Sequence, residues 1–324
     1  MIEQYEKRPI DDNSRGKKIL YLLFSVIIGI VLIAPRDITW ARDRMNYLVY
    51  ADYSWDIMQR YISNGIFSFF SNEPLFLGIN ALLSQMISAE NIVRFIIFIS
   101  TIGVLYSLGK LSNYNFFVLF FFLFVPQILK NHIIHLRQGL GLSVYLLGLV
   151  SNKKYGKILR FSSMFIHTSF VFLILFEGLE ALFRKSQLKF SSKISLSIIF
   201  LIVLVIAVPS LASYFGDRRV LEYSFEMAQG ASGFGFILWL MVGSFFILII
   251  KKSYINIICC YGIFMYIISY FSLEFGARIF ENIIPLILVG ALTDERKEVR
   301  IIFIVFFVFF GAFQWYSNGI NFLI

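Results

Sequence analysis

Apolar runs recur along the whole chain and constrain its fold more than any other feature of the sequence. A helix that crosses the hydrocarbon core of a bilayer needs about 20 largely apolar residues, and fewer where it is broken or packed inside a bundle. The candidate segments are Ile19–Ala34, Leu75–Ile87, Ile92–Leu108, Phe116–Leu129, Leu140–Val150, Ile158–Phe183 with a polar break at His167, Ile194–Leu211, Gly233–Ile250, Tyr254–Leu273, Ile279–Leu292 and Ile301–Phe313. The sequence therefore predicts an all-α polytopic integral membrane protein with about 10 or 11 membrane segments, some of them re-entrant or broken.

The composition agrees with a chain whose main solvent is the bilayer. Of 324 residues, 58% are hydrophobic and only 15% are charged, unlike a soluble domain with polar faces. We expect a single transmembrane domain over residues 1–324, with residues 1–18 as a cytoplasmic tail and residues 35–74 and 212–232 as two periplasmic loops. The net charge of +9 is compatible with nucleic acid, but in a chain this apolar we expect anionic membrane lipids and phosphorylated lipids as partners instead.

Lysine and arginine in short loops orient the segments, because loops rich in these residues favour the cytoplasmic side of a membrane. The basic clusters that this rule places inside are Lys7 to Lys18, Lys153 to Lys157, Arg184 to Lys193, Lys251-Lys252 and Arg296 to Arg300. The N-terminus is then cytoplasmic. The short run Leu75–Ile87 must be re-entrant or strongly tilted, so that Pro74 and Arg137 can both lie outside.

A set of arginines falls on the outer side, against the tendency of positive residues to stay inside. Its members are Arg36, Arg42, Arg44, Arg60, Arg137, Arg218, Arg219 and Arg278. A planar guanidinium group can bind phosphate or carboxylate through two parallel hydrogen bonds. Arg137 and Arg278 interrupt or border apolar runs, so each needs a buried partner or a polar cavity. Pairing with nearby acids or with lipid headgroups is the alternative for every member of the set.

His167 belongs to the polar trio His167-Thr168-Ser169, which interrupts an apolar stretch. An imidazole titrates near neutral pH, so this side chain can act as an acid, a base or a hydrogen-bond donor to a sugar hydroxyl. It can equally do no more than stabilise the helix break. The sequence leaves both roles open.

The first outer stretch mixes acids, amides and aromatic rings at helical spacing, in Asp43 to Tyr47 and then Tyr50 and Tyr53. Such a face suits sugars, and it suits the membrane interface equally well. His132 and His135 lie near each other, but no carboxylate or cysteine is close in sequence, so no metal site is expected. The sequence has no nucleotide-binding glycine motif and no HExxH motif, which leaves ATP-driven transport and zinc hydrolysis without support.

Several segments resemble the EpsG-like family of polysaccharide polymerases in their order and spacing. They are Arg42-Asp43-Arg44-Met45-Asn46-Tyr47, Asn72-Glu73-Pro74-Leu75-Phe76, Leu136-Arg137-Gln138-Gly139-Leu140 with Ser143, Lys153-Lys154, Phe165-Ile166-His167-Thr168-Ser169, Arg219 to Tyr223 and Ala277-Arg278. In that family an Arg-Gln pair opens a helix, and a histidine near a serine follows after a basic turn. The likeness extends from about Asp43 to Leu292, and it departs at Gly141, where the family commonly has alanine.

The resemblance implies a Wzy-type polymerase of O-antigen or capsule polysaccharide. This group is similar to other polytopic, GT-C-like glycosyltransferases that act on lipid-linked sugars, including O-antigen ligases. Such an enzyme transfers a growing glycan from undecaprenyl pyrophosphate onto a repeat unit on the same lipid, at the periplasmic face. The resemblance implies no nucleotide sugar, no cofactor and no metal ion, and it suggests a chain-length regulator protein as a further partner.

The outer residues suit this chemistry. Negative charge builds on the pyrophosphate as the anomeric bond breaks, and preorganised arginines can stabilise that charge without a metal ion. The residues expected to bind substrate or pyrophosphate are Arg44, Tyr47, Arg137, Gln138, Arg218, Arg219, Tyr223 and Arg278. For the base that activates the acceptor hydroxyl, His167 and Asp43 are candidates between which the sequence does not decide, and Glu73 is the third.

Three other functions are alternatives to the polymerase. An O-antigen-type ligase would use the same donor and the same arginines, so the sequence separates it poorly. A flippase or other transporter of lipid-linked oligosaccharide is disfavoured, because no internal repeat is visible and the unusual polar residues fall on one side of the membrane rather than at its midplane. An O-acyltransferase is disfavoured, because this sequence shows no convincing His-Asp pair deep in a cytoplasmic funnel.

Overall fold

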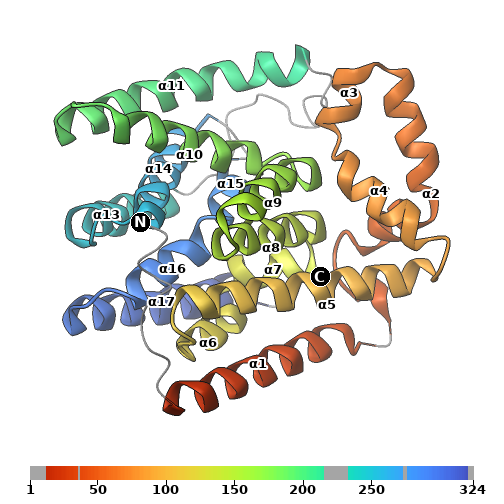
Figure 1. The fold of residues 1–324 in the computed structure, drawn as a ribbon, viewed down its shortest axis with the longest axis horizontal. Helices are drawn as coiled ribbons and strands as arrows, with labels where there is room; N and C mark the ends of the chain where they lie inside the picture. The colour runs from red at the N-terminus through yellow and green to blue at the C-terminus, as the bar shows by residue number, and fades with distance from the viewer. Residues whose placement is uncertain (1–11, 36, 215–232, 273–275, 320–324) are drawn as a thin grey trace.

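The computed structural model describes residues 12–35, 37–214, 233–272 and 276–319, and the regular structure within these ranges is helical (Figure 1). The elements are α1 (Asp12–Ile33), the 3₁₀ helix η2 (Ile38–Trp40), α2 (Arg44–Ser63), α3 (Ile66–Ser71), α4 (Pro74–Leu83), α5 (Ala89–Leu111), α6 (Phe117–Phe124), α7 (Pro126–Ile133), α8 (Leu136–Val150), α9 (Lys153–Ile166), α10 (Phe170–Lys185), α11 (Phe190–Tyr214), α13 (Phe234–Ile249), α14 (Tyr254–Ser269), α15 (Gly276–Glu281), α16 (Ile284–Leu292) and α17 (Lys297–Asn318). The predicted all-α class is confirmed.

Within the described ranges, four helices are long and apolar enough to cross a membrane. They provide the segments Arg15–Ile33, Ala89–Leu111, Ser192–Leu211 and Lys297–Ser317. The pair α7 and α8 would make a fifth span, bent by 107°, and α4, α13 and α14 are shorter apolar helices. This combination of long and broken apolar helices is that of a polytopic membrane protein.

The helices form a bundle, and two lysines lie at one end of it. Figure 1 shows α1, α5 and α11 running across the view in similar directions, with α2, α3 and α4 gathered at one end. In the centre, α5 packs against both α1 and α8, and α8 packs against α9. At the end away from α2, Lys17 Nζ donates to the carbonyl of Asn113 at 3.2 Å, and Lys110 Nζ donates to the carbonyl of Val150 at 2.9 Å. Lys17 and Lys110, which the sequence predicts to be cytoplasmic, therefore lie at the same end of the bundle.

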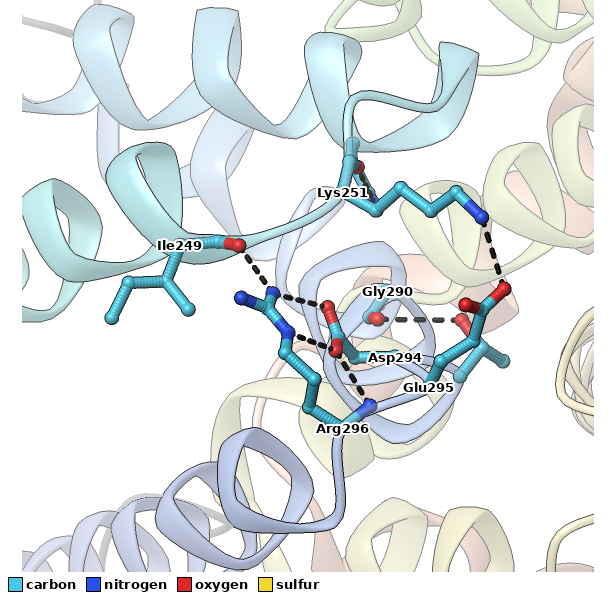
Figure 2. A network of polar contacts seen from close by, with 8 residues as sticks. Ile249, Lys251, Gly290, Asp294, Glu295 and Arg296 are labelled. Carbon is cyan, nitrogen blue, oxygen red and sulfur yellow. Dashed lines mark hydrogen bonds and ion pairs between the residues drawn. The ribbon is translucent and has the colours of Figure 1, made fainter.

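A network of polar contacts joins the α13–α14 link to the α16–α17 link (Figure 2). The guanidinium group of Arg296 donates to Asp294 through Nε to Oδ1 and Nη2 to Oδ2, both at 2.9 Å, and also to the carbonyl of Ile249. These hydrogen bonds from Arg296 hold the pKa of the Asp294 carboxyl below its usual range. Lys251 and Glu295 add an exposed pair at 2.9 Å. Two basic clusters that the sequence places on the same side of the membrane thus contact each other.

The structure breaks two of the predicted segments where proline interrupts the helical ladder. Phe116–Leu129 is divided between α6 and α7, and Pro126 begins α7 because it has no N–H to continue the preceding helix. Ile279–Leu292 is divided between α15 and α16, with Pro285 in the first turn of α16. α4 is only 10 residues long, so it rises about 15 Å, too little for a full span.

The predicted outer loop over residues 35–74 contains helices that a search for apolar runs cannot find. α2 has 20 residues, and its buried positions include Tyr47, Tyr50, Ala51 and Ser54, which is the spacing of one helix face. Its other faces are polar or interfacial, so its mean hydropathy is low. In the predicted N-terminal tail, α1 begins at Asp12, and residues 1–11 lie outside the described residues. Most of the predicted loop 212–232 also lies outside them.

Two glycines let α8 approach its neighbours. A Cβ atom on Gly139 would lie 2.1 Å from the carbonyl oxygen of Asn131, at the bend between α7 and α8. A Cβ atom on Gly141 would lie 2.5 Å from the ring of Phe170 in α10. The departure from the family's usual alanine at Gly141 therefore has a local reason, since the larger side chain would displace that ring.

We expect Gly139→Ala to destabilise the protein, because the obstacle is a backbone oxygen that a rotamer change cannot remove. Overpacking of this kind costs about 1–3 kcal/mol. The thermal unfolding midpoint in detergent is the measurement. Gly78→Ala is the matched control, since no atom lies within 4 Å of a Cβ atom at that position in α4. Equal midpoints for the two variants would contradict the close packing at the bend.

Candidate functional site

Side-chain contacts join four interruptions of helical backbone where the start of α4 approaches α8 and α9. They are the α3–α4 link with Glu73, the α7–α8 bend before Arg137, the α9–α10 break at His167, and the α15–α16 link with Asn282. Non-helical backbone at membrane depth is tolerated where it is buried in protein or lines a polar cavity. This convergence marks the region as a candidate functional site.

Glu73 joins three of these elements. It is 3% exposed, and its two carboxylate oxygens bind different partners: Oε2 accepts from Arg137 Nη1 at 2.5 Å, and Oε1 lies 2.5 Å from His167 Nδ1. Its backbone is left-handed, with φ 62°, immediately before Pro74. That conformation costs a residue with a Cβ atom about 1–2 kcal/mol. Strain of this kind at a buried charged residue is typical of functional positions.

Arg137 is enclosed by aromatic side chains of α2. Its guanidinium carbon lies 5.1 Å from the centre of the Tyr50 ring, and the guanidinium group also hydrogen-bonds to the side chain of Tyr47. Its Nε atom is buried and has no hydrogen-bond partner among the described residues. The side chain as a whole is 20% exposed. The group is therefore fixed in position, and its Nε donor is not matched within the described protein.

Gln138 connects the same helix to the C-terminal part of the chain. Its Nε2 donates to the carbonyl of Arg278 at 2.8 Å and to Asn282 Oδ1 at 3.0 Å. The amide nitrogen of Asn282 in turn donates to Ser169 Oγ at 3.0 Å, beside the α9–α10 break. This chain of hydrogen bonds holds the α15–α16 link against the first turn of α8 and close to His167.

The other predicted site residues are placed as follows. Arg44 is 2% exposed and its Nε donates to the carbonyl of Ile133 at 2.7 Å, which ties α2 to the α7–α8 bend. Asp43, at the start of α2, is exposed with φ 64°, and Arg278 is exposed on α15. Arg218, Arg219 and Tyr223 lie outside the described residues. The predicted residues that the described contacts bring together are thus Glu73, Arg137, His167, Tyr47 and Gln138.

This arrangement has clear chemical possibilities. Because Nδ1 of His167 faces Glu73, proton exchange between the imidazole and a substrate would proceed through Nε2, with the carboxylate stabilising the charged ring. Arg137 supplies a fixed positive charge and planar donors for an anion. One carboxylate thus holds both a guanidinium group that can bind an anion and an oriented imidazole. This combination suits transfer reactions with an anionic leaving group.

The sequence did not single out two polar groups near this site. Asn282 lies in the α15–α16 link, and an ion pair between Lys130 and Glu281 lies beside His135. Lys130 directly follows an apolar run, and this position indicates that its charge needs a partner. Its carboxylate partner is remote in sequence. Within the described ranges, no group of three or more His, Cys, Asp or Glu residues could hold a metal ion.

Comparison with known proteins agrees with the segments noted in the sequence. The searches of curated proteins and of solved structures find no match to this chain. The model of the EpsG family, however, matches residues 18–322, which is nearly the whole chain and includes every described residue of the site. The chain is therefore a member of the EpsG family.

Proposed function

We propose that this protein is a glycan polymerase of a bacterial inner membrane. In this proposal it transfers a growing oligosaccharide from undecaprenyl pyrophosphate onto a lipid-linked repeat unit, at the periplasmic face, with its N-terminus in the cytoplasm. Membership of the EpsG family supports a role in polysaccharide polymerisation and a transferase of the glycosyltransferase type. The donor, the acceptor and the side of the membrane are our proposals.

The observation that carries the proposal is the Glu73 carboxylate that holds Arg137 and His167 together at the meeting of helix breaks. The anomeric carbon–oxygen bond of the donor breaks, and its electron pair leaves with the pyrophosphate. Arg137 stabilises that charge, with Arg278 and the Arg218-Arg219 pair as further contributors. The acceptor hydroxyl attacks the anomeric carbon, and its proton passes to Nε2 of His167. A single displacement of this kind inverts the configuration at that carbon.

Other predicted residues have supporting places in this proposal. Tyr47 fixes the guanidinium group of Arg137, and Gln138 fixes the α15–α16 link. Tyr223 is proposed to contact the sugar, and Asp43 is the alternative base. A positioned general base contributes about 10²–10⁴-fold to the rate of such a transfer.

The test is the glycan made by a host strain that lacks this gene, compared with the same strain complemented by the wild-type gene. We expect the null strain to carry only single repeat units and the complemented strain to show a ladder of polymer. If the null strain accumulates finished polymer on its lipid carrier, the protein is a ligase. If repeat units remain on the cytoplasmic face, it is a flippase, and the polymerase proposal fails in either case.

A further inference from the structure

A second ionic cluster lies on the other side of the α7–α8 bend. Lys130 of α7 forms an ion pair with Oε1 of Glu281, at the end of α15. The other carboxylate oxygen, Oε2, lies 3.5 Å from Nδ1 of His135. The Glu281 side chain is only 6% exposed, whereas those of Lys130 and His135 are 23% and 18% exposed. A buried carboxylate therefore lies beneath two partly accessible groups.

Glu281 Oε2 and His135 Nδ1 are buried and face each other at 3.5 Å, and in the described part of the chain neither makes a hydrogen bond of normal geometry. Gln127 Oε1 is also buried and has no hydrogen-bond partner among the described residues. Gln127 and Lys130 are three residues apart in α7, so they lie on the same face of that helix. Buried polar groups are almost always hydrogen-bonded, so a long contact between Glu281 and His135 beside an unpartnered amide oxygen on the Lys130 face of α7 indicates a site that a polar molecule completes.

The residue types indicate which molecule that is. A phosphate group is disfavoured, because the charge of Lys130 is already balanced and the carboxylate would repel an anion. A metal ion is disfavoured by the lysine ammonium beside the carboxylate. A hydroxyl group fits, since it donates to a carboxylate or amide oxygen and accepts from an imidazole or ammonium group through the same atom. Sugars carry several such hydroxyls on neighbouring ring carbons.

The position of the cluster relates it to the proposed active site. His135 immediately precedes α8 and Arg137 lies in its first turn, and the two side chains contact carboxylates of different elements. Arg137 binds Glu73, while His135 approaches Glu281, which precedes the Gln138 partner Asn282 in the chain. We infer that Gln127, Lys130, His135 and Glu281 form a subsite that binds the hydroxyls of the acceptor sugar. This inference rests on the proposed polymerase function.

The experiment measures transfer by the purified full-length protein in lipid nanodiscs. The acceptor is a prenyl-linked repeat unit whose anomeric oxygen is replaced by carbon, so that it cannot serve as a donor. The donor is saturating undecaprenyl-pyrophosphate oligosaccharide. If wild-type protein makes no product, the proposed function fails. If it does, the effect of substitutions on the KM for the acceptor tests the subsite separately.

We expect Glu281→Gln to raise the acceptor KM about 10- to 100-fold, the effect of losing a hydrogen bond to a charged group, with kcat changed much less. Because this substitution leaves Lys130 without its partner, the double variant Lys130→Met with Glu281→Gln removes both charges. The acceptor KM should stay high in the double variant, even though folding is restored. Recovery of a wild-type KM there would show that the cluster is only a structural ion pair.

A matched control comes from another partly buried pair, in which Arg160 Nε lies 2.9 Å from Glu177 Oε1, with side chains 12% and 14% exposed. Replacing both by Met and Gln should leave the acceptor KM unchanged. Two further results would overturn the subsite. One is an unchanged acceptor KM in Glu281→Gln. The other is a loss of kcat with no change in KM, which would place Glu281 in the chemical step instead.

Discussion

Arg137→Ala is expected to abolish the polymer ladder in the complemented null strain. The substitution removes a fixed positive group that Glu73, Tyr47 and Tyr50 hold in place. Loss of one preorganised donor to a developing anion lowers kcat by about 10²–10³-fold, and a whole guanidinium group supplies more than one donor. The measurement is the glycan ladder at matched membrane expression, together with the transfer rate of the purified protein.

Two further variants separate charge and position in this result. Arg137→Lys keeps the charge but loses the planar fork, so its transfer rate should lie between those of the wild type and Arg137→Ala. Arg60→Ala removes an exposed arginine from the end of α2, where its guanidinium carbon lies 5.7 Å from the ring centre of Tyr61, and should leave the ladder intact. A normal ladder from Arg137→Ala would refute its assignment to the pyrophosphate.

Glu73→Gln is expected to impair both stability and transfer. The carboxylate is the partner of Arg137 and His167, and its loss leaves a partly buried guanidinium group without a counter-charge. Breaking a buried ion pair in this way lowers the free energy of unfolding by about 3 kcal/mol or more. The thermal midpoint in detergent and the transfer rate are measured on the same preparations.

The double variant Glu73→Gln with Arg137→Met tells the two effects apart. Removal of both charges should bring the midpoint back toward that of the wild type, while transfer stays absent. Glu177→Gln is the matched control, because it breaks a comparable pair with Arg160 and should lower stability without abolishing transfer. If the double variant regains transfer, Glu73 and Arg137 serve the fold alone.

The sequence predicted the helical class, the break at His167 and the grouping of Lys251 with Arg296, because hydropathy and basic loops report directly on the bilayer. It also indicated Arg137, since a charge beside apolar runs needs a partner. The partner itself could not be deduced. Glu73 and His167 are 94 residues apart, and their contact depends on how separate helices pack.

Local composition also concealed part of the architecture. α2 was assigned to a loop because only one of its faces is apolar, and helix packing decides its burial. Glu281 had no sequence signal that linked it to His135, since the two belong to helices that meet only in the folded bundle. Arg44 and Arg137 have the same side chain, but Arg44 Nε donates to the backbone carbonyl of Ile133, whereas Arg137 pairs with a carboxylate. The sequence does not distinguish these two roles, because they depend on where each helix packs.

The hydrogen bonds of Gln138 have a consequence for biosynthesis. Its partners Arg278 and Asn282 follow it by 140 and 144 residues, and Asn282 reaches back over 113 residues to Ser169. A ribosome adds residues one at a time, and segments enter the membrane in that order. Arg137, Glu73 and His167 are therefore inserted long before the α15–α16 link that braces them exists. The contacts between α8 and the α15–α16 link can therefore form only after Asn282 has been made.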